Sequence, residues 1–178
     1  MNGEHGDDTE RVRALRQAFD ETFARPPRAG VTDLEDLLGI QVGGDPYAVR
    51  LGEIAGLFVD KRIVPLPSTM PGLLGVAGIR GGVVPVYGLY ALLGYPTPAT
   101  PPRWFVLTGE RVGLGFGDLD GYLRITSADV AQVPSESAER HVRETVRVGG
   151  TQRAILSIPS VVETIKKRLA AGGPQKDR

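Results

Sequence analysis

The sequence predicts a mainly β protein made of two pseudo-repeated small β-barrels packed together, with an N-terminal amphipathic helix and short capping helices. Glycine and proline, 24 and 14 of 178 residues, divide the chain into many short segments. Short apolar runs alternate with glycine-centred turns, a pattern typical of β-hairpins. Residues 42–57 also match residues 107–122, 65 positions later, without a gap. This match indicates an internal duplication.

The overall composition argues against several classes of function. Basic and acidic residues balance at 21 each, so no global positive charge favours nucleic-acid binding. Cysteine is absent, which removes disulfides and thiolate metal sites and suits a reducing cytosol. No segment approaches the roughly 18 apolar residues of a membrane span, and the N-terminus lacks a signal-peptide pattern. We therefore expect a cytoplasmic protein without nucleic-acid partners or direct membrane insertion.

Residues 1–30 are expected to contain a loose tail and an amphipathic helix. The helix is predicted from about Asp8 to Ala24, because apolar residues recur there at helical spacing. The apolar residues of this stripe are Val12, Leu15, Phe19 and Phe23. The stripe either packs on the rest of this chain or docks on another protein, and the sequence leaves both alternatives open.

Residues 31–170 are expected to form the main domain. We place the first barrel at about residues 37–94 and the second at about residues 103–170. The proline-rich segment 95–102 connects them and is expected to be stiff and extended. Residues 171–178 are expected to form a loose C-terminal tail.

Each barrel is expected to contain two hairpins followed by a helix. Glycine supplies the positive φ angle that tight hairpin turns require. The predicted turns are Gly43-Gly44-Asp45, Arg80-Gly81-Gly82, Gly109-Glu110 and Gly149-Gly150. The first helix is predicted over residues 89–93, between Gly88 and Gly94, and the second begins behind Ser157.

No catalytic, cofactor or metal site is predicted, and we expect that the protein is not an enzyme. The two histidines, His5 and His141, have no second ligand at metal-binding spacing. Asp118 and Asp120 resemble an acid–base pair, but Glu53 takes the place of Asp118 in the first repeat. We therefore interpret the acid at position 118 as a structural feature of the repeat. A small enzyme or ligand-binding β-barrel is the alternative, which a buried polar cavity with converging Asp118, Asp120 or His141 would support.

The segment from Gly75 to Leu89, GVAGIRGGVVPVYGL, resembles the central signature of CheW-like domains. The order of the flanking elements over about residues 37–170 also agrees with this family. The resemblance implies two SH3-like barrels in a non-enzymatic adaptor of a bacterial chemosensory array. Such an adaptor couples the cytoplasmic tip of a chemoreceptor to the regulatory domain of a CheA-type histidine kinase, and other CheW-like domains are further partners. The alternative is a CheW-like regulatory module of a non-chemotaxis pathway with a non-kinase partner.

The resemblance also implies a receptor-facing groove between the barrels. The protein-binding residues carried over to this sequence are Ile54, Gly56, Gly75, Arg80 and Tyr122. We rank Arg80 first, because an exposed guanidinium at a hairpin turn can bind a carboxylate in bidentate fashion. An ordinary solvated turn arginine is the alternative.

Two residues depart from the family pattern. Gly78 stands where the family usually has Asn, and Gly88 stands where it usually has an Asp that would cap the following helix. A glycine at this capping position costs only a few tenths of a kcal/mol. We therefore expect the fold to be kept, whereas the choice of partners is left open because a polar group is missing beside Arg80.

Overall fold

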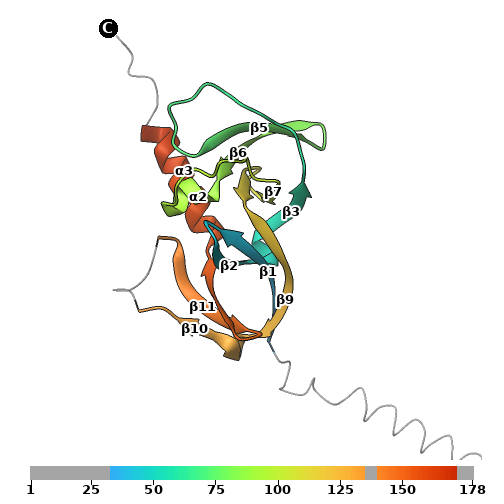
Figure 1. Ribbon diagram of the computed structural model, residues 1–178, viewed down its shortest axis with the longest axis vertical. Coiled ribbons are helices and arrows are strands. Elements are labelled where there is room, and N and C mark those ends of the chain that lie inside the picture. Colours follow the sequence, from blue (N-terminus) through green and yellow to red (C-terminus); the bar gives the residue numbers. More distant parts are fainter. Residues whose placement is uncertain (1–32, 135–139, 172–178) are drawn as a thin grey trace, which may run out of the picture. The chain divides into compact units, whose positions relative to one another are not determined.

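The computed structural model of the chain describes residues 33–134 and 140–171, which contain two six-stranded β-sheets (Figure 1). The N-terminal helix expected over residues 8–24 lies outside the described residues.

The first sheet, sheet A, contains strands from both ends of the described chain. They are β1 (Leu34–Val42), β2 (Asp45–Arg50), β9 (Asp118–Thr126), β10 (Val130–Gln132), β11 (Val142–Val148) and β12 (Thr151–Leu156). Their order across the sheet is β10-β11-β12-β2-β1-β9. All neighbours are antiparallel except β12 and β2, which are parallel.

The second sheet, sheet B, contains the strands that lie between them in the sequence. They are β3 (Ile54–Val59), β4 (Ile63–Val64), β5 (Leu73–Ile79), β6 (Gly82–Gly88), β7 (Trp104–Thr108) and β8 (Gly113–Phe116). Their order is β3-β7-β8-β6-β5-β4. Again all neighbours are antiparallel except one pair, β6 and β8.

The helices confirm the boundaries expected from the sequence. The helix α2 (Leu89–Leu93) begins after Gly88 and ends at Gly94, which adopts the left-handed conformation with φ 90°. The helix α3 (Ile158–Ala171) follows Ser157, whose side-chain oxygen accepts a hydrogen bond from the Ser160 amide at 3.4 Å. Two 3₁₀ turns, η1 (Leu51–Glu53) and η2 (Ser127–Asp129), connect strands. The four predicted hairpin turns are also confirmed.

The internal duplication is visible in the topology. Each strand from β1 to β6 has its counterpart six strands later, and the order of sheet A becomes that of sheet B under this correspondence. Both repeats end in a helix. However, each repeat places its first hairpin in one sheet and its other four strands in the other sheet. The two repeats are therefore interlocked.

The strand exchange changes the expected division of the chain into barrels. Residues 37–94 and 103–170 correspond to the two repeats, but neither range supplies a whole sheet, because β1 and β2 pair with β9 and β12. Each sheet curves around its own small core, as expected for two SH3-like barrels. The buried residues of these cores are Leu37, Ala48, Ile125, Val146 and Ile155 in sheet A, and Ala77, Ile79, Val84, Val86, Phe105 and Leu107 in sheet B.

The largest part of the described core joins the two sheets in a seam. Leu38 and Ile40 of β1 belong to the same apolar cluster as Val106 of β7 and Leu114 of β8. Residues of α2 and α3 complete this cluster. Figure 1 shows the two helices on the left and the edge strands β3 and β9 on the right. The helices therefore cover one side of the seam, and the edge strands border the other.

Candidate protein-binding surfaces

Two exposed apolar side chains lie at corresponding positions of the repeats, on the edge strands of the two sheets. Leu57 of β3 is 37% exposed and Tyr122 of β9 is 52% exposed. Leu57 pairs in register with Val106, and Tyr122 with Leu38, and both of these partners are buried in the seam. Because paired residues share a face of the sheet, Leu57 and Tyr122 lie at the exposed margin of the seam.

A third side chain belongs to the same margin. Val59, two residues after Leu57 on β3, is 41% exposed. We call Leu57, Val59 and Tyr122 together the β3–β9 edge. Exposed aromatic and aliphatic residues beside a packed core are typical of protein-binding surfaces.

The side chain of Tyr122 is held in place by two charged neighbours. Its hydroxyl donates a hydrogen bond to the carboxylate of Asp36 on β1. Arg124 donates to the same carboxylate from Nε at 2.8 Å, and its guanidinium carbon lies 5.6 Å from the centre of the Tyr122 ring. The hydrogen bonds from Arg124 and Tyr122 lower the pKa of Asp36, so this carboxylate stays ionised near neutral pH. Because the Tyr122 side chain is already held in place, it loses little conformational entropy when a partner binds to it.

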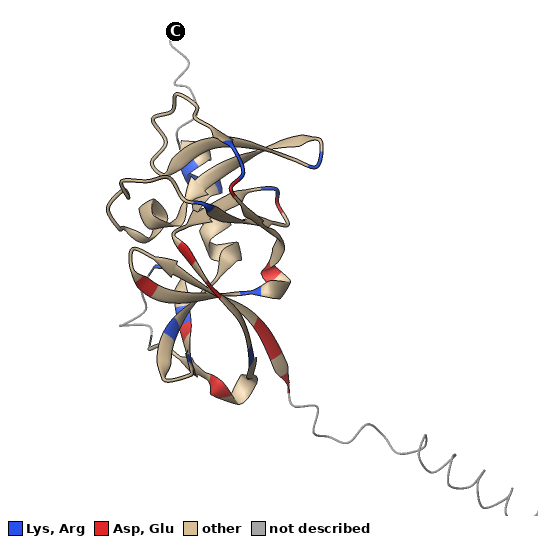
Figure 2. Cartoon of the chain, turned by 45° about the vertical axis from the view of Figure 1, so that its right-hand side comes forward, with Lys and Arg blue, Asp and Glu red and all other residues tan. Residues whose placement is uncertain are grey.

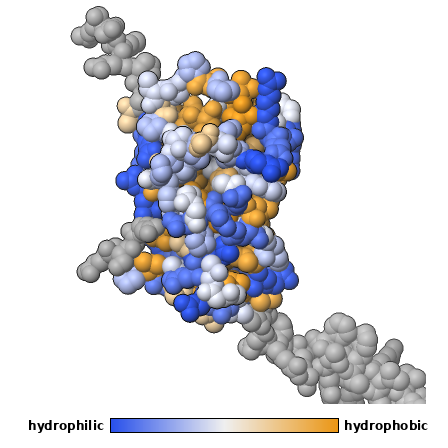
Figure 3. All heavy atoms as spheres, viewed as in Figure 1, coloured by the Kyte–Doolittle hydropathy of each residue, from blue (hydrophilic) through white to orange (hydrophobic). Residues whose placement is uncertain are grey.

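A second apolar surface covers the outer face of sheet B. Val64, Val76 and Pro85 lie side by side on β4, β5 and β6, as their register shows. The next step along β5 and β6 pairs Gly78 with Val83, which is 69% exposed. We call these five residues the hairpin face. Figure 3 shows apolar residues reaching the surface in the upper part of the molecule, where Figure 1 draws β5 and β6.

Two basic residues, Arg80 and Arg111, lie at the tip of the β5–β6 hairpin. Arg80 lies at the tip with φ 48°, in the left-handed region, and this residue is exposed. Figure 2 colours the basic positions along the backbone blue. Within the described residues, the Arg80 guanidinium has neither a hydrogen bond nor an ion pair. The guanidinium of Arg111, from the β7–β8 turn, lies beside Gly82. The two guanidinium groups make this end of sheet B positively charged, so it repels basic groups and favours an acidic partner.

The five binding residues inferred from the family resemblance do not form a single cluster. Arg80 and Tyr122 are exposed but belong to different sheets. Ile54 and Gly56 lie at the start of β3, next to a bulge, and are half-buried. Gly75 is buried. Their roles in binding stay a prediction.

Gly75 has a structural role in the backbone. It adopts φ 142°, and a β-carbon there would lie 2.1 Å from the carbonyl oxygen of Val64. Only glycine therefore allows β4 to approach β5 this closely. Sequence reasoning missed Leu57 and Val59, although Leu57 lies 65 residues before Tyr122 and the duplication already related these positions.

The polar residues considered for an enzyme or ligand-binding barrel belong to separate networks. Asp120 accepts a hydrogen bond from Gln41 at 2.7 Å and forms an ion pair with Arg153. His141 Nδ1 lies 2.9 Å from the hydroxyl of Ser160 on α3. Asp118 is exposed and bonds to neither of them. The seam itself is filled by apolar side chains.

Other features bear on the class of site. Across the part of the chain that the structure describes, no three His, Cys, Asp or Glu side chains gather as metal ligands. In the same residues, no helix combines the length and apolar character that a membrane crossing requires.

Known proteins resemble this chain in sequence and in fold. Residues 36–166 match the family model of the CheW-like domain. Protein FrzA of Myxococcus xanthus is 33% identical over 117 residues, which cover 61% of this chain and 73% of that protein. The scaffolding protein TtCheW from Thermoanaerobacter tengcongensis has a similar fold, with a TM-score of 0.62 and 14% identity. That match covers 70% of this chain and 89% of the solved one.

Proposed function

This chain belongs to the CheW-like domain family, and from that premise we propose that it is a non-enzymatic cytoplasmic adaptor. It couples the cytoplasmic tips of chemoreceptors to the regulatory domain of a CheA-type histidine kinase in a bacterial chemosensory array. The similar solved protein, TtCheW, is a scaffolding protein, which supports the general role. The specific partners are part of the proposal.

The observation that carries the proposal is the correspondence of Leu57 and Tyr122. The duplication places an exposed apolar side chain at corresponding positions of β3 and β9, at the margin of the seam. The apolar face of an amphipathic helix from a partner would pack against both edges at once. We therefore assign the β3–β9 edge, with Ile54 and Gly56 at its beginning, to the receptor.

An adaptor needs a second surface that stays accessible while the first is occupied. The hairpin face and Arg80 lie on sheet B, on the side of its strands opposite to the barrel interior. Val83 at this face is more exposed than any other large apolar residue described. We assign this surface to the kinase regulatory domain, and Gly75 supports it by keeping β4 in register with β5.

The proposal is tested by reconstitution with a kinase and a receptor from the same organism. The purified chain should bind the isolated kinase regulatory domain and a soluble receptor-tip fragment, and a ternary complex should form. Size-exclusion chromatography with light scattering detects the two binary complexes and the ternary complex. A chain that binds the receptor fragment but no CheA-type kinase, while its circular dichroism shows a folded β protein, would favour the alternative regulatory module with a non-kinase partner.

A further inference from the structure

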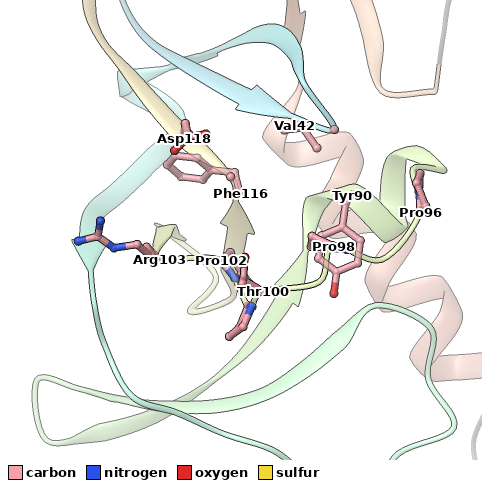
Figure 4. Close-up of a pocket in the computed structure, with 12 residues that line it drawn as sticks. Val42, Tyr90, Pro96, Pro98, Thr100, Pro102, Arg103, Phe116 and Asp118 are labelled. Carbon is pink, nitrogen blue, oxygen red and sulfur yellow. The ribbon is translucent and has the colours of Figure 1, made fainter.

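A small pocket lies beneath the proline-rich connector, and its lining residues belong to neither surface described above. Its volume is about 220 Å³, and its walls come from β1, α2, the connector and the turn between β8 and β9. Figure 4 shows Tyr90 and Pro98 at one end and Arg103 and Asp118 at the other. Phe116 and Pro102 also line it. The pocket is therefore apolar with a charged rim.

The apolar wall depends on a glycine. A β-carbon at Gly88 would lie 2.4 Å from the ring of Tyr90. Only glycine at this position therefore allows Tyr90 to occupy its place in the pocket wall. Tyr90 and Phe116 offer two aromatic rings, and the nearby prolines add rigid apolar surface. Such a lining favours an aromatic ring, which stacks in offset or edge-to-face geometry.

The charged rim carries a carboxylate that its repeat counterpart uses differently. Glu53, 65 residues before Asp118, accepts a hydrogen bond from the Ile158 amide at 2.9 Å and so stabilises the start of α3. Asp118 makes no such bond to α2, and no hydrogen bond or ion pair of its side chain occurs among the described residues. Asp118 therefore does not have, in the second repeat, the helix-stabilising role that Glu53 has in the first.

The positive charge of the rim, Arg103, is already paired with a carboxylate outside the pocket lining. Arg103 donates two hydrogen bonds to Asp60, at 2.8 and 2.7 Å. Asp118 lies close enough to Arg103 to raise its pKa further, although the hydrogen bond to Asp60 is the larger cause. Two carboxylates thus face one guanidinium, and Asp118 keeps its capacity for hydrogen bonds. A cationic group of a ligand would neutralise the charge of Asp118 and donate hydrogen bonds to its carboxylate.

We propose that this pocket binds a partner segment in which an aromatic side chain is followed directly by lysine or arginine. The aromatic ring enters between Tyr90 and Phe116, and the basic side chain reaches Asp118. The pocket volume suits a single ring rather than a larger ligand. The proposal does not depend on the identity of the receptor or the kinase, since neither assigned surface includes these residues.

The test uses the full chain, labelled with ¹⁵N, and the acetylated and amidated peptide Gly-Phe-Arg-Gly. Two comparison peptides replace Phe by Ala or Arg by Glu. The first peptide should shift the amide signals of Gly43 and Gly117, which line the pocket, with an apparent Kd of about 1 mM. Both comparison peptides should bind at least severalfold more weakly.

Variants place the contact at the pocket. Asp118→Asn should weaken binding of Gly-Phe-Arg-Gly about two- to fivefold, as expected for one exposed ion pair. Thr100→Phe, at an exposed position of the connector, should fill the pocket and abolish the shifts. Glu163→Gln, an exposed acid on α3, is the matched control and should leave binding unchanged. Equal binding of the Phe and Ala peptides, or unchanged affinity in Asp118→Asn, would overturn the proposal.

Discussion

The ring of Tyr95 occupies the space that a β-carbon of Gly43 would take, since that atom would lie 2.1 Å from Cδ1 of the ring. The Tyr95 hydroxyl donates a hydrogen bond to Asp45 at 2.6 Å and lies 2.7 Å from the hydroxyl of Tyr47. The ring of Tyr47 meets it edge to face at a centroid distance of 6.4 Å. Tyr95 thus fixes the beginning of the connector on the β1–β2 turn of sheet A.

Tyr95→Phe tests this anchor. The variant keeps the ring but loses the hydroxyl contacts to Asp45 and Tyr47. We expect the free energy of unfolding to fall by about 1–2 kcal/mol in urea denaturation. Tyr122→Phe removes a hydroxyl from an exposed ring, so its effect should stay within about 0.5 kcal/mol. Equal effects of the two variants would argue against a stabilising anchor.

Gly75 and Gly78 provide a matched pair of substitutions on β5. Gly75→Ala places a β-carbon 2.1 Å from the Val64 carbonyl oxygen at φ 142°, so we expect a loss of more than about 2 kcal/mol. Gly78→Ala meets no atom within 4 Å and should be neutral or stabilise by up to about 1 kcal/mol. Urea denaturation of both variants measures the difference, and a tolerated Gly75→Ala would contradict the close approach of β4.

Glu144 and Arg50 predict a pH dependence of stability. The hydrogen bond from Arg50 is the main cause that lowers the pKa of Glu144, with Gln132 adding to it against the opposing effect of burial. Because the pKa of this carboxyl is lower in the folded state, its stabilisation is present above the unfolded pKa, near 4.5, and is lost as the pH falls through the folded value.

We therefore expect Glu144→Gln to destabilise the protein by about 1 kcal/mol at pH 7, after allowing for the solvent exposure of the pair. At about pH 3 the variant should approach the wild type. Urea denaturation at both pH values gives the two differences. The same difference in the free energy of unfolding at both pH values would mean that the ionisation of Glu144 does not stabilise the folded state.

Arg80→Glu tests the hairpin surface. Reversing an unpaired exposed charge should weaken the complex with the kinase regulatory domain by about tenfold, while the melting temperature changes little. Isothermal titration calorimetry measures the affinity. Arg143→Glu, at an exposed position of β11 in sheet A, is the control and should bind as the wild type does. Unaltered binding by Arg80→Glu would exclude Arg80 from the kinase interface.

Tyr122→Ala tests the β3–β9 edge. Buried aromatic side chains dominate the energy of many interfaces, so we expect at least about tenfold weaker binding of the receptor-tip fragment. Leu169→Ala on α3 removes an apolar side chain that is 51% exposed, compared with 52% for Tyr122, and should have no effect. Fluorescence anisotropy of a labelled receptor fragment compares the two. Equal affinities would remove the edge from the receptor interface.

Local interactions determine the features that could be predicted from the sequence. Turns such as Gly43-Gly44 and Gly149-Gly150 were predictable because positive φ angles restrict the residue type at each position. The same holds for α2, whose ends are marked by Gly88 and Gly94. The candidate binding residues were harder to predict, because exposure of Tyr122 and burial of Gly75 depend on strands distant in the sequence.

By itself, the sequence determined the mainly β class, the hairpin turns, the two capping helices and the duplication, since these follow from local conformational preference and from repeated residue patterns. Only the tertiary structure decided that the repeats exchange their first hairpins. The pairing of β2 with β12 and of β8 with β6 joins segments that no local pattern relates. The same long-range packing decided that Glu53 stabilises α3 while its counterpart Asp118 lies at the rim of a pocket.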